Sequence, residues 1–186
     1  MLRLSQTRYR QLKAIVDTYA YDEIETIYTS MIPSRQSLVT PVIMPIDTYV
    51  SHWEKVEYDH RIFTDDMPEI ITEKGEQVLS KSEKILADKF LLLNIPYRYE
   101  FPLFLSGIGI AHPDFMLLNK HNRQEYYWEH MGKMDDPEYA EQALLRINAY
   151  QKNGFIPGRN LILSYETKKH PIDMKIAEIQ MREYLL

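Results

Sequence analysis

After Gly75 the chain alternates helix-like and strand-like segments in an order that few folds accommodate. The first helix-like run, at 80–92, has Ser80 or Ser82 as a candidate N-cap residue. Its apolar stripe would be formed by Ile85, Leu86, Phe90, Leu91 and Leu92. Three runs with the alternation or the aromatic content of strands follow, at 97–103, 110–118 and 125–131. Glycine and polar residues separate these runs, so they predict an antiparallel meander.

A second helix-like run follows the meander at about 138–152, after Asp135 and Asp136, which are candidate capping residues. Its apolar face would contain Tyr139, Ala143, Leu144, Ile147 and Tyr150. The run at 161–165 is continuously apolar, as in a buried strand, and 172–186 predicts a final helix. The whole order predicts an α/β fold with a mixed sheet flanked by helices.

The first third of the chain has a different character. Residues 5–30 show the apolar spacing of a helix, whereas Pro33, Pro41 and Pro45 argue against a long helix or a central strand in 31–66. We expect irregular structure or short strands there. The sequence therefore predicts a helical and irregular N-terminal extension over 1–70 and a second domain over 71–186.

Composition restricts the class of protein. The 186 residues are 45% hydrophobic and 26% charged, which is ordinary for a globular protein and sufficient for one core. No apolar run approaches the ~20 residues of a membrane span, and the N-terminus lacks the apolar core of a signal peptide. The absence of cysteine excludes disulfides and thiolate metal sites. We expect a cytoplasmic protein with no membrane partner.

Three acidic residues lie on separate elements of the predicted fold: Glu83 on the first helix, Asp114 on the second strand and Glu129 on the third. A helix followed by adjacent strands would bring their carboxylates together. Hard divalent cations take oxygen ligands, commonly one or two carboxylates plus water and a substrate phosphate. This pattern favours a metal-dependent phosphodiesterase. The formal net charge of −5 is unusual for a protein that binds nucleic acid, although acids grouped at a metal site contribute to it.

These residues also carry a resemblance. The segments S-K-S-E-K-I, P-Y-R-Y-E, P-D-F, Y-Y-W-E-H and M-D-D-P-E-Y-A, together with the order of elements, resemble the PD-(D/E)xK nuclease superfamily over about Glu76–Leu186. They look closest to its uncharacterised bacterial and phage-associated nuclease-like proteins. The resemblance implies a restriction-endonuclease-like αβββαβ core and a nuclease that hydrolyses phosphodiester bonds. Its substrate would be nucleic acid, DNA more than RNA.

The resemblance also implies roles for the acids. Asp114 would be the central ligand of Mg²⁺ or Mn²⁺, Glu129 would be the second carboxylate, and Glu83 would bind the metal directly or through water. The backbone carbonyl of His130 is a further candidate ligand. The family places a lysine two residues after the second acid, but Met131 occupies that position here.

Three residues are candidates to replace the lysine that is missing at Met131. Lys84 and Lys81 flank Glu83, and we rank both above His130, which strand alternation would turn to the opposite face of the sheet. Glu166-Thr167-Lys168 matches Glu-x-Lys literally, but it follows the fourth strand and we read the match as accidental.

Three alternatives remain open. Met131 is compatible with a nuclease fold that has lost cleavage and acts as a nucleic-acid-binding or assembly module. His112 and His130 would suit zinc, although they lie on different strands without a close ligand set. Residues 1–70 would be the dimerisation segment if the protein forms a homodimer.

Overall fold

A computed structural model describes Arg8, Gln11, 26–64 and 67–186. The chain forms two compact units, Met1–Trp53 and Glu54–Leu186. Most of the helix predicted at 5–30 lies outside the described residues. In 31–66 the expected short strands are absent from the described positions, and the short helices α3 (Pro33–Gln36) and α4 (Ile46–Glu54) occur instead. Proline suits this placement because it is tolerated in the first turn of a helix, as Pro33 shows.

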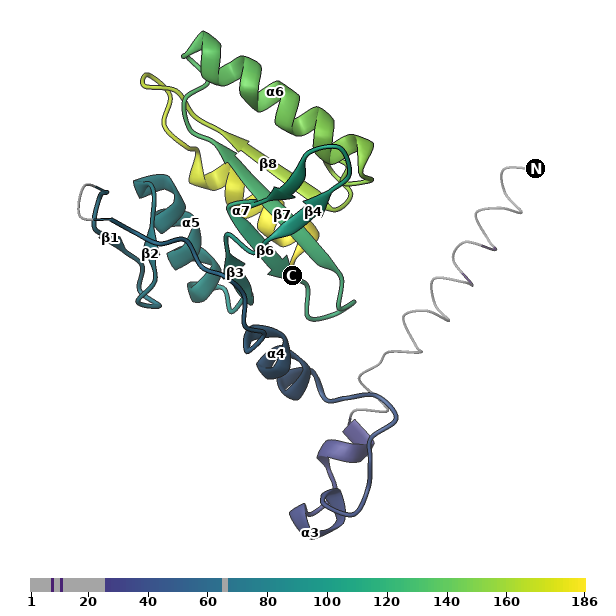
Figure 1. Cartoon of the computed structure of the whole chain (residues 1–186). Coiled ribbons are helices and arrows are strands. Elements are labelled where there is room, and N and C mark those ends of the chain that lie inside the picture. Colours follow the sequence, from purple (N-terminus) through teal and green to yellow (C-terminus); the bar gives the residue numbers. More distant parts are fainter. Residues whose placement is uncertain (1–7, 9–10, 12–25, 65–66) are drawn as a thin grey trace. The chain divides into compact units, whose positions relative to one another are not determined.

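The second unit is a mixed α/β structure built on a four-stranded mixed sheet (Figure 1). Its strands are β3 (Tyr97–Tyr99), β6 (Phe115–Leu118), β7 (Glu125–Met131) and β8 (Leu161–Tyr165), in that spatial order. The first three strands are antiparallel neighbours, and β8 runs parallel to β7. Helices α5 (Lys81–Leu92), α6 (Pro137–Lys152) and α7 (Met174–Tyr184) flank the sheet. The predicted mixed sheet flanked by helices is confirmed.

The predicted strands differ from the observed ones in their continuity. The segment 97–103 breaks at Glu100, whose φ is +48°, a left-handed conformation that strand residues do not adopt. After this break, β4 (Leu103–Leu105) pairs with β5 (Gly109–Ala111) in a separate hairpin. A second hairpin that the sequence analysis missed, β1 (Ile70–Ile71) with β2 (Gln77–Val78), turns around Gly75 at φ +86°.

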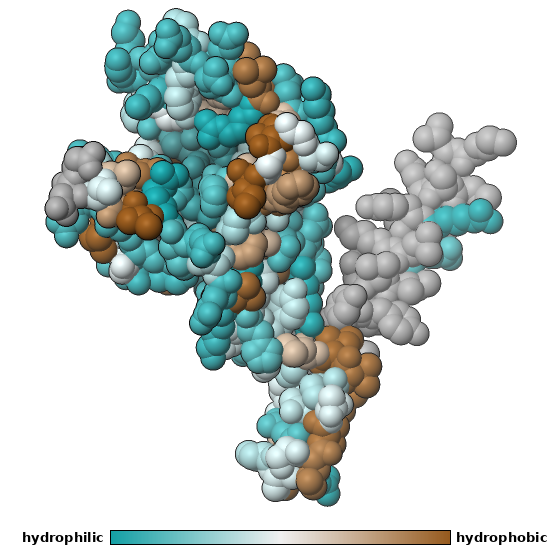
Figure 2. Space-filling model, in the orientation of Figure 1, coloured by the Kyte–Doolittle hydropathy of each residue, from teal (hydrophilic) through white to brown (hydrophobic). Residues whose placement is uncertain are grey.

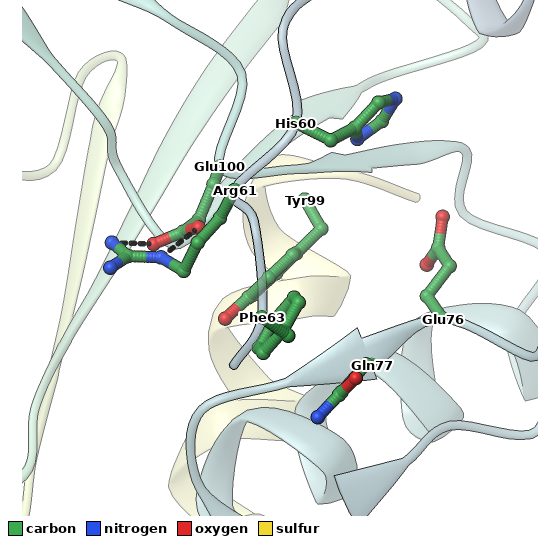
Figure 3. A pocket seen from close by; sticks show the side chains of 7 residues that line it. All are labelled: His60, Arg61, Phe63, Glu76, Gln77, Tyr99 and Glu100. Carbon is green, nitrogen blue, oxygen red and sulfur yellow. Dashed lines mark hydrogen bonds and ion pairs between the residues drawn. The ribbon is translucent and has the colours of Figure 1, made fainter. Parts of the chain in front are cut away.

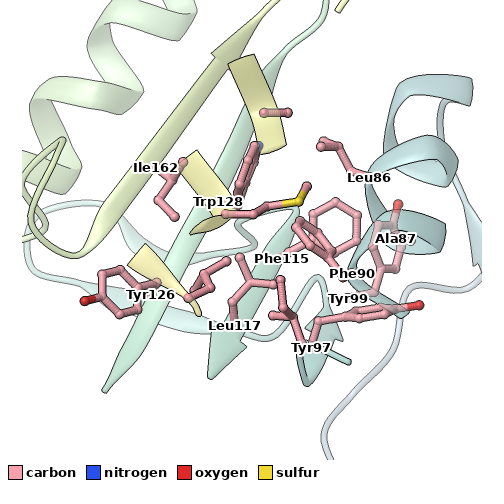
Figure 4. Packing of buried hydrophobic residues seen from close by; sticks show 14 of the residues in the cluster. Leu86, Ala87, Phe90, Tyr97, Tyr99, Phe115, Leu117, Tyr126, Trp128 and Ile162 are labelled. Atoms are coloured by element: carbon pink, nitrogen blue, oxygen red, sulfur yellow. The ribbon is translucent and has the colours of Figure 1, made fainter. Parts of the chain in front are cut away.

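The two faces of the sheet have different partners. Phe115, Trp128 and Ile162 are cross-strand neighbours on one face and belong to the main buried cluster. Figure 4 shows Phe115 and Trp128 beside Phe90 of α5, with ring centroids 5.2 and 5.4 Å from that of Phe90. The cluster also includes α7 residues such as Met181. Because side chains alternate along a strand, Glu129 faces the opposite side, which α6 covers.

Ser80 and Asp136 are the caps that start α5 and α6. The Ser80 hydroxyl accepts a hydrogen bond from Glu83 N, and the Asp136 carboxylate accepts from Glu138 N and Tyr139 N. These caps satisfy backbone N–H groups that the helices leave unpaired. They also fix Glu83 in the first turn of α5 and the residue at which α6 begins.

The visible surface of the second unit is mostly hydrophilic, with apolar side chains gathered over the β4–β5 hairpin (Figure 2). Phe104, Ile108 and Ile110 are the exposed apolar residues of this hairpin. No helix among the described residues is long and apolar enough to cross a membrane.

Candidate active site

Glu83 is positioned by the start of α5. Glu83 is buried, and its Oε2 atom accepts hydrogen bonds from Tyr99 Oη at 2.7 Å and from Leu79 N at 3.0 Å. Ser80 at the N-cap forces Glu83 into the first turn, where the helix dipole favours a negative charge. The carboxylate is therefore anchored between the beginning of α5 and the end of β3.

Asp114 directly precedes β6, and its Oδ2 atom accepts a hydrogen bond from His130 N at 2.6 Å. Burial is the largest cause of a pKa well above the ordinary value for this carboxyl group, and the charges of Glu129 and Glu83 raise the pKa further. The hydrogen bond from His130 N and the charge of Arg146 act in the opposite direction. Phe115, which follows Asp114, pairs with Trp128 on one side and with Tyr99 on the other, and Tyr99 is the residue bonded to Glu83. The neighbouring strands therefore bring Glu83, Asp114 and Glu129 into one region of the fold.

Glu129 is fully buried in the middle of β7, beneath α6. Its Oε1 atom accepts a hydrogen bond from Arg146 Nη1 at 2.6 Å, and its Oε2 atom accepts from Tyr150 Oη at 3.1 Å. Burial raises the pKa of the Glu129 carboxyl group, while Arg146 and Tyr150 oppose that shift. Burial and the charge of Glu129 also raise the pKa of Tyr150, so its hydroxyl keeps the proton that it donates.

Arg146 is a site residue that the sequence analysis did not select. It follows Ala143 by three residues and precedes Tyr150 by four, so the helical period places all three on one face of α6. Ala143 and Tyr150 are fully buried. The sequence contained a signal for Arg146: it is a charged residue inside an otherwise apolar helical stripe, and such a residue requires a buried partner.

The two lysine candidates, Lys84 and Lys81, do not contact the acids at β6 and β7 in the part of the chain that the structure describes. Lys84 Nζ contacts Asp88 Oδ2 at 2.8 Å and Glu73 Oε1 at 3.9 Å, and Lys81 is exposed. Neither has a described contact with Asp114 or Glu129. Met131, at the position where the resemblance implies a lysine, is fully buried.

His130 turns its ring away from the acids, as strand alternation predicts. The ring Nδ1 atom lies 2.8 Å from Ser164 Oγ, and Nε2 lies 3.3 Å from Glu166 Oε1. Glu166 Oε2 also accepts a hydrogen bond from Ser82 Oγ at 2.7 Å. Burial alone would raise the Glu166 pKa, but hydrogen bonds from Ser82, His130 and Ile172 N lower it. Glu166 therefore has a structural role between α5 and the end of β8.

His112 and His130 have separate partners, since His112 Nδ1 lies 3.0 Å from Glu100 O. Within the described ranges, no three His, Asp or Glu side chains form an arrangement ready to hold a metal ion. The acids instead contact Arg146, two tyrosines and backbone N–H groups. Their all-oxygen donor set nevertheless has the chemistry that hard divalent cations prefer.

No family model matches the chain. The protein described as "Uncharacterized protein MJ1519", from Methanocaldococcus jannaschii, is 39% identical to it over 88 residues. The match covers 47% of this chain and 7% of that protein, so the chain spans a small part of its relative's length. The relative's description assigns no activity.

Proposed function

We propose that the protein is a nuclease that uses Mg²⁺ or Mn²⁺ to hydrolyse phosphodiester bonds, with DNA as the favoured substrate. The carrying observation is the position of Asp114 beside Glu129: Asp114 directly precedes Phe115, which pairs with Trp128, and its carboxylate accepts a hydrogen bond from His130 N. Burial and the charges of Glu129 and Glu83 raise the pKa of this carboxyl group. Crowded carboxylates destabilise one another unless a cation joins them, and a divalent cation would offset that repulsion. Such a cation lowers the pKa of bound water and neutralises charge on a phosphate.

The topology is compatible with a restriction-endonuclease-like core. With the separate β4–β5 hairpin set aside, the order α5, β3, β6, β7, α6, β8, with β8 parallel to β7, supports the αβββαβ core that the resemblance implies. In this proposal Asp114, directly before β6, and Glu129 on β7 would hold the cation, and Glu83 would contribute from α5. His130 holds Asp114 in place through its backbone N–H group at 2.6 Å.

Arg146 supplies the positive charge that Met131 cannot supply in this mechanism. Its guanidinium group contacts Glu129 Oε1 at 2.6 Å, and its side chain is 39% exposed. An arginine so placed can turn its remaining N–H donors toward a phosphate oxygen, where charge-assisted hydrogen bonds stabilise developing negative charge. Arginine stays protonated, so it orients and stabilises groups but does not act as the base.

The test is a cleavage assay on single-stranded DNA, duplex DNA and RNA in Mg²⁺ or Mn²⁺. Asp114→Asn keeps an oxygen that can accept the His130 hydrogen bond but removes the charge. We expect cleavage by the parent and its loss in this variant, by at least about 10²-fold. Asp135→Asn makes the same chemical change at an exposed acid and should cleave as the parent does. Equal cleavage by the parent and Asp114→Asn would contradict the proposal.

A second candidate is a nuclease fold that binds nucleic acid without cutting it. The buried Met131 favours this candidate, because it leaves no ammonium group on the strand that carries Glu129. The same assay separates the two functions. Nucleic-acid binding without turnover in either metal would favour the binding module, whereas turnover that Asp114→Asn abolishes would exclude it.

A further inference from the structure

A hollow of about 230 Å³ lies at the end of β3 and is lined by residues outside the proposed cation site (Figure 3). Its lining comes from three places in the sequence: the segment before β1, strand β2 with the residue preceding it, and the end of β3. The lining residues are His60, Arg61, Phe63, Glu76, Gln77, Tyr99 and Glu100. Sites for drug-sized ligands have volumes of about 300–1,000 Å³, so this hollow has room for roughly one ring system.

The walls of the hollow are aromatic on two sides. Figure 3 shows Phe63 next to Tyr99 and His60 on another side, with Glu76 and Gln77 across from them. His60 is exposed and Phe63 is half-buried, so a ligand can reach both rings. Aromatic rings provide stacking surfaces for nucleobases, while a carboxylate and an amide can hydrogen-bond to a base edge.

The hollow adjoins the acids through Tyr99 and Glu100. Tyr99 lines it and donates a hydrogen bond to Glu83 at 2.7 Å. Glu100 N donates to Asp114 O at 3.0 Å. Two residues that line the hollow are therefore hydrogen-bonded to two of the three acids.

Arg61 lines the hollow and contacts Glu100, the residue whose backbone is bonded to Asp114. Its Nε and Nη2 atoms donate to the two oxygens of Glu100 at 2.7 and 2.6 Å, and 40% of its side chain is exposed. These two bonds use only part of the guanidinium donor set. Among the residues that the structure describes, Glu100 is the acceptor bonded to this group, which leaves Nη1 available for a phosphate oxygen.

We propose that this hollow is a nucleobase subsite, which holds one unstacked base of a single-stranded nucleic acid next to the phosphate at the acids. The subsite rests on the proposed function, since it names the form of the substrate. His60 and Phe63 stack on the base, Gln77 contacts its edge, and Arg61 contacts the adjoining phosphate.

Binding of labelled single-stranded oligonucleotides tests the subsite. The set contains one intact strand and strands with a single abasic position at each place in turn. Fluorescence polarisation is measured on the full chain in EDTA, so that cleavage does not compete. We expect one abasic position to weaken binding by the parent about tenfold, in line with the usual strength of base stacking on aromatic side chains.

Two variants change residues that line the hollow, and a third variant is the matched control. His60→Ala removes an exposed ring, and Phe63→Leu removes a ring but keeps apolar packing. Each should bind the intact strand more weakly and should lose sensitivity to the abasic position. Phe104→Leu makes the same change as Phe63→Leu at an exposed aromatic residue of the β4–β5 hairpin, and it should behave as the parent does.

The outcomes separate the subsite from the proposed function. If the parent binds strands and no abasic position changes its affinity more than about twofold, the subsite is wrong while the nuclease proposal stands. The subsite is also wrong if the two variants weaken intact and abasic strands equally. If the protein neither binds strands in EDTA nor cleaves them with metal, both proposals fail.

Discussion

Asp114 shows the central physical conflict of the site at the scale of one residue. Its carboxyl group combines burial with the charges of Glu83 and Glu129, and it has an unusually high pKa as a result. A group with these properties reduces stability at neutral pH in the absence of a cation. Functional sites often retain such unfavourable arrangements because the ligand relieves them.

Asp114→Asn should therefore stabilise the metal-free protein at pH 7. In the parent, the pKa of the Asp114 carboxyl group is higher in the folded state than in the unfolded state. The contribution of Asp114 to stability therefore falls as pH rises from the ordinary carboxyl range through the folded-state pKa. Thermal unfolding in EDTA should show a midpoint about 2–4 °C higher for the variant at pH 7, and a smaller difference at pH 5. A lower midpoint for the variant at pH 7 would indicate that Asp114 is not a strained carboxyl group.

At the scale of elements, α6 is attached to the sheet through a charged contact as well as apolar packing. Arg146 and Tyr150 both donate to Glu129 of β7. Tyr127 and Phe155 add an edge-to-face ring contact with centroids 5.0 Å apart, from β7 to the residue shortly after α6. The position of α6 therefore determines which donors face the acids.

Arg146→Met and Glu129→Gln should show coupled effects on stability. Arg146→Met alone leaves the buried Glu129 charge without its cation, so it should destabilise more in the parent than in the Glu129→Gln background. A double-mutant cycle from urea unfolding should give a coupling energy of about 1–3 kcal/mol. If the effects of the two substitutions on the free energy of unfolding add within about 0.5 kcal/mol, the ion pair does not hold α6 to the sheet.

The sequence was sufficient to predict the long elements and the caps of this fold. The runs around α5, β7, α6 and β8 have clear periodicity. Ser80 and Asp136, which were among the candidate capping residues, are the N-caps of α5 and α6. Glu100 shows why strand continuity was not predictable. Its left-handed backbone accompanies two hydrogen bonds with the distant Arg61, and no local pattern contains that information.

The site was predictable only in part for a similar reason. The acids could be selected from their residue types and their places on separate elements. The partners that hold them could not, because Arg146 and Tyr150 reach Glu129 from α6, about 20 residues away in sequence. The hollow beside Tyr99 likewise requires the segment around Arg61 to pass close to β3.

At the scale of the whole molecule, the acids come from three separate places in the sequence of the second unit. Glu83 lies on α5, Asp114 directly before β6 and Glu129 on β7, while Arg146 approaches from α6. The formal net charge of −5 gives the chain no general attraction to phosphate. Binding to nucleic acid would therefore depend on local groups such as Arg61 and Arg146, and a cation held by the acids would strengthen it.

The most direct test of this account is calorimetric titration of the metal-free protein with Mn²⁺. The parent and Asp135→Asn should show saturable binding, and Asp114→Asn should bind at least about tenfold more weakly, because it removes a charged oxygen ligand from the gathered acids. Equal Mn²⁺ affinity in the parent and Asp114→Asn would contradict the account, whatever the cleavage assay showed.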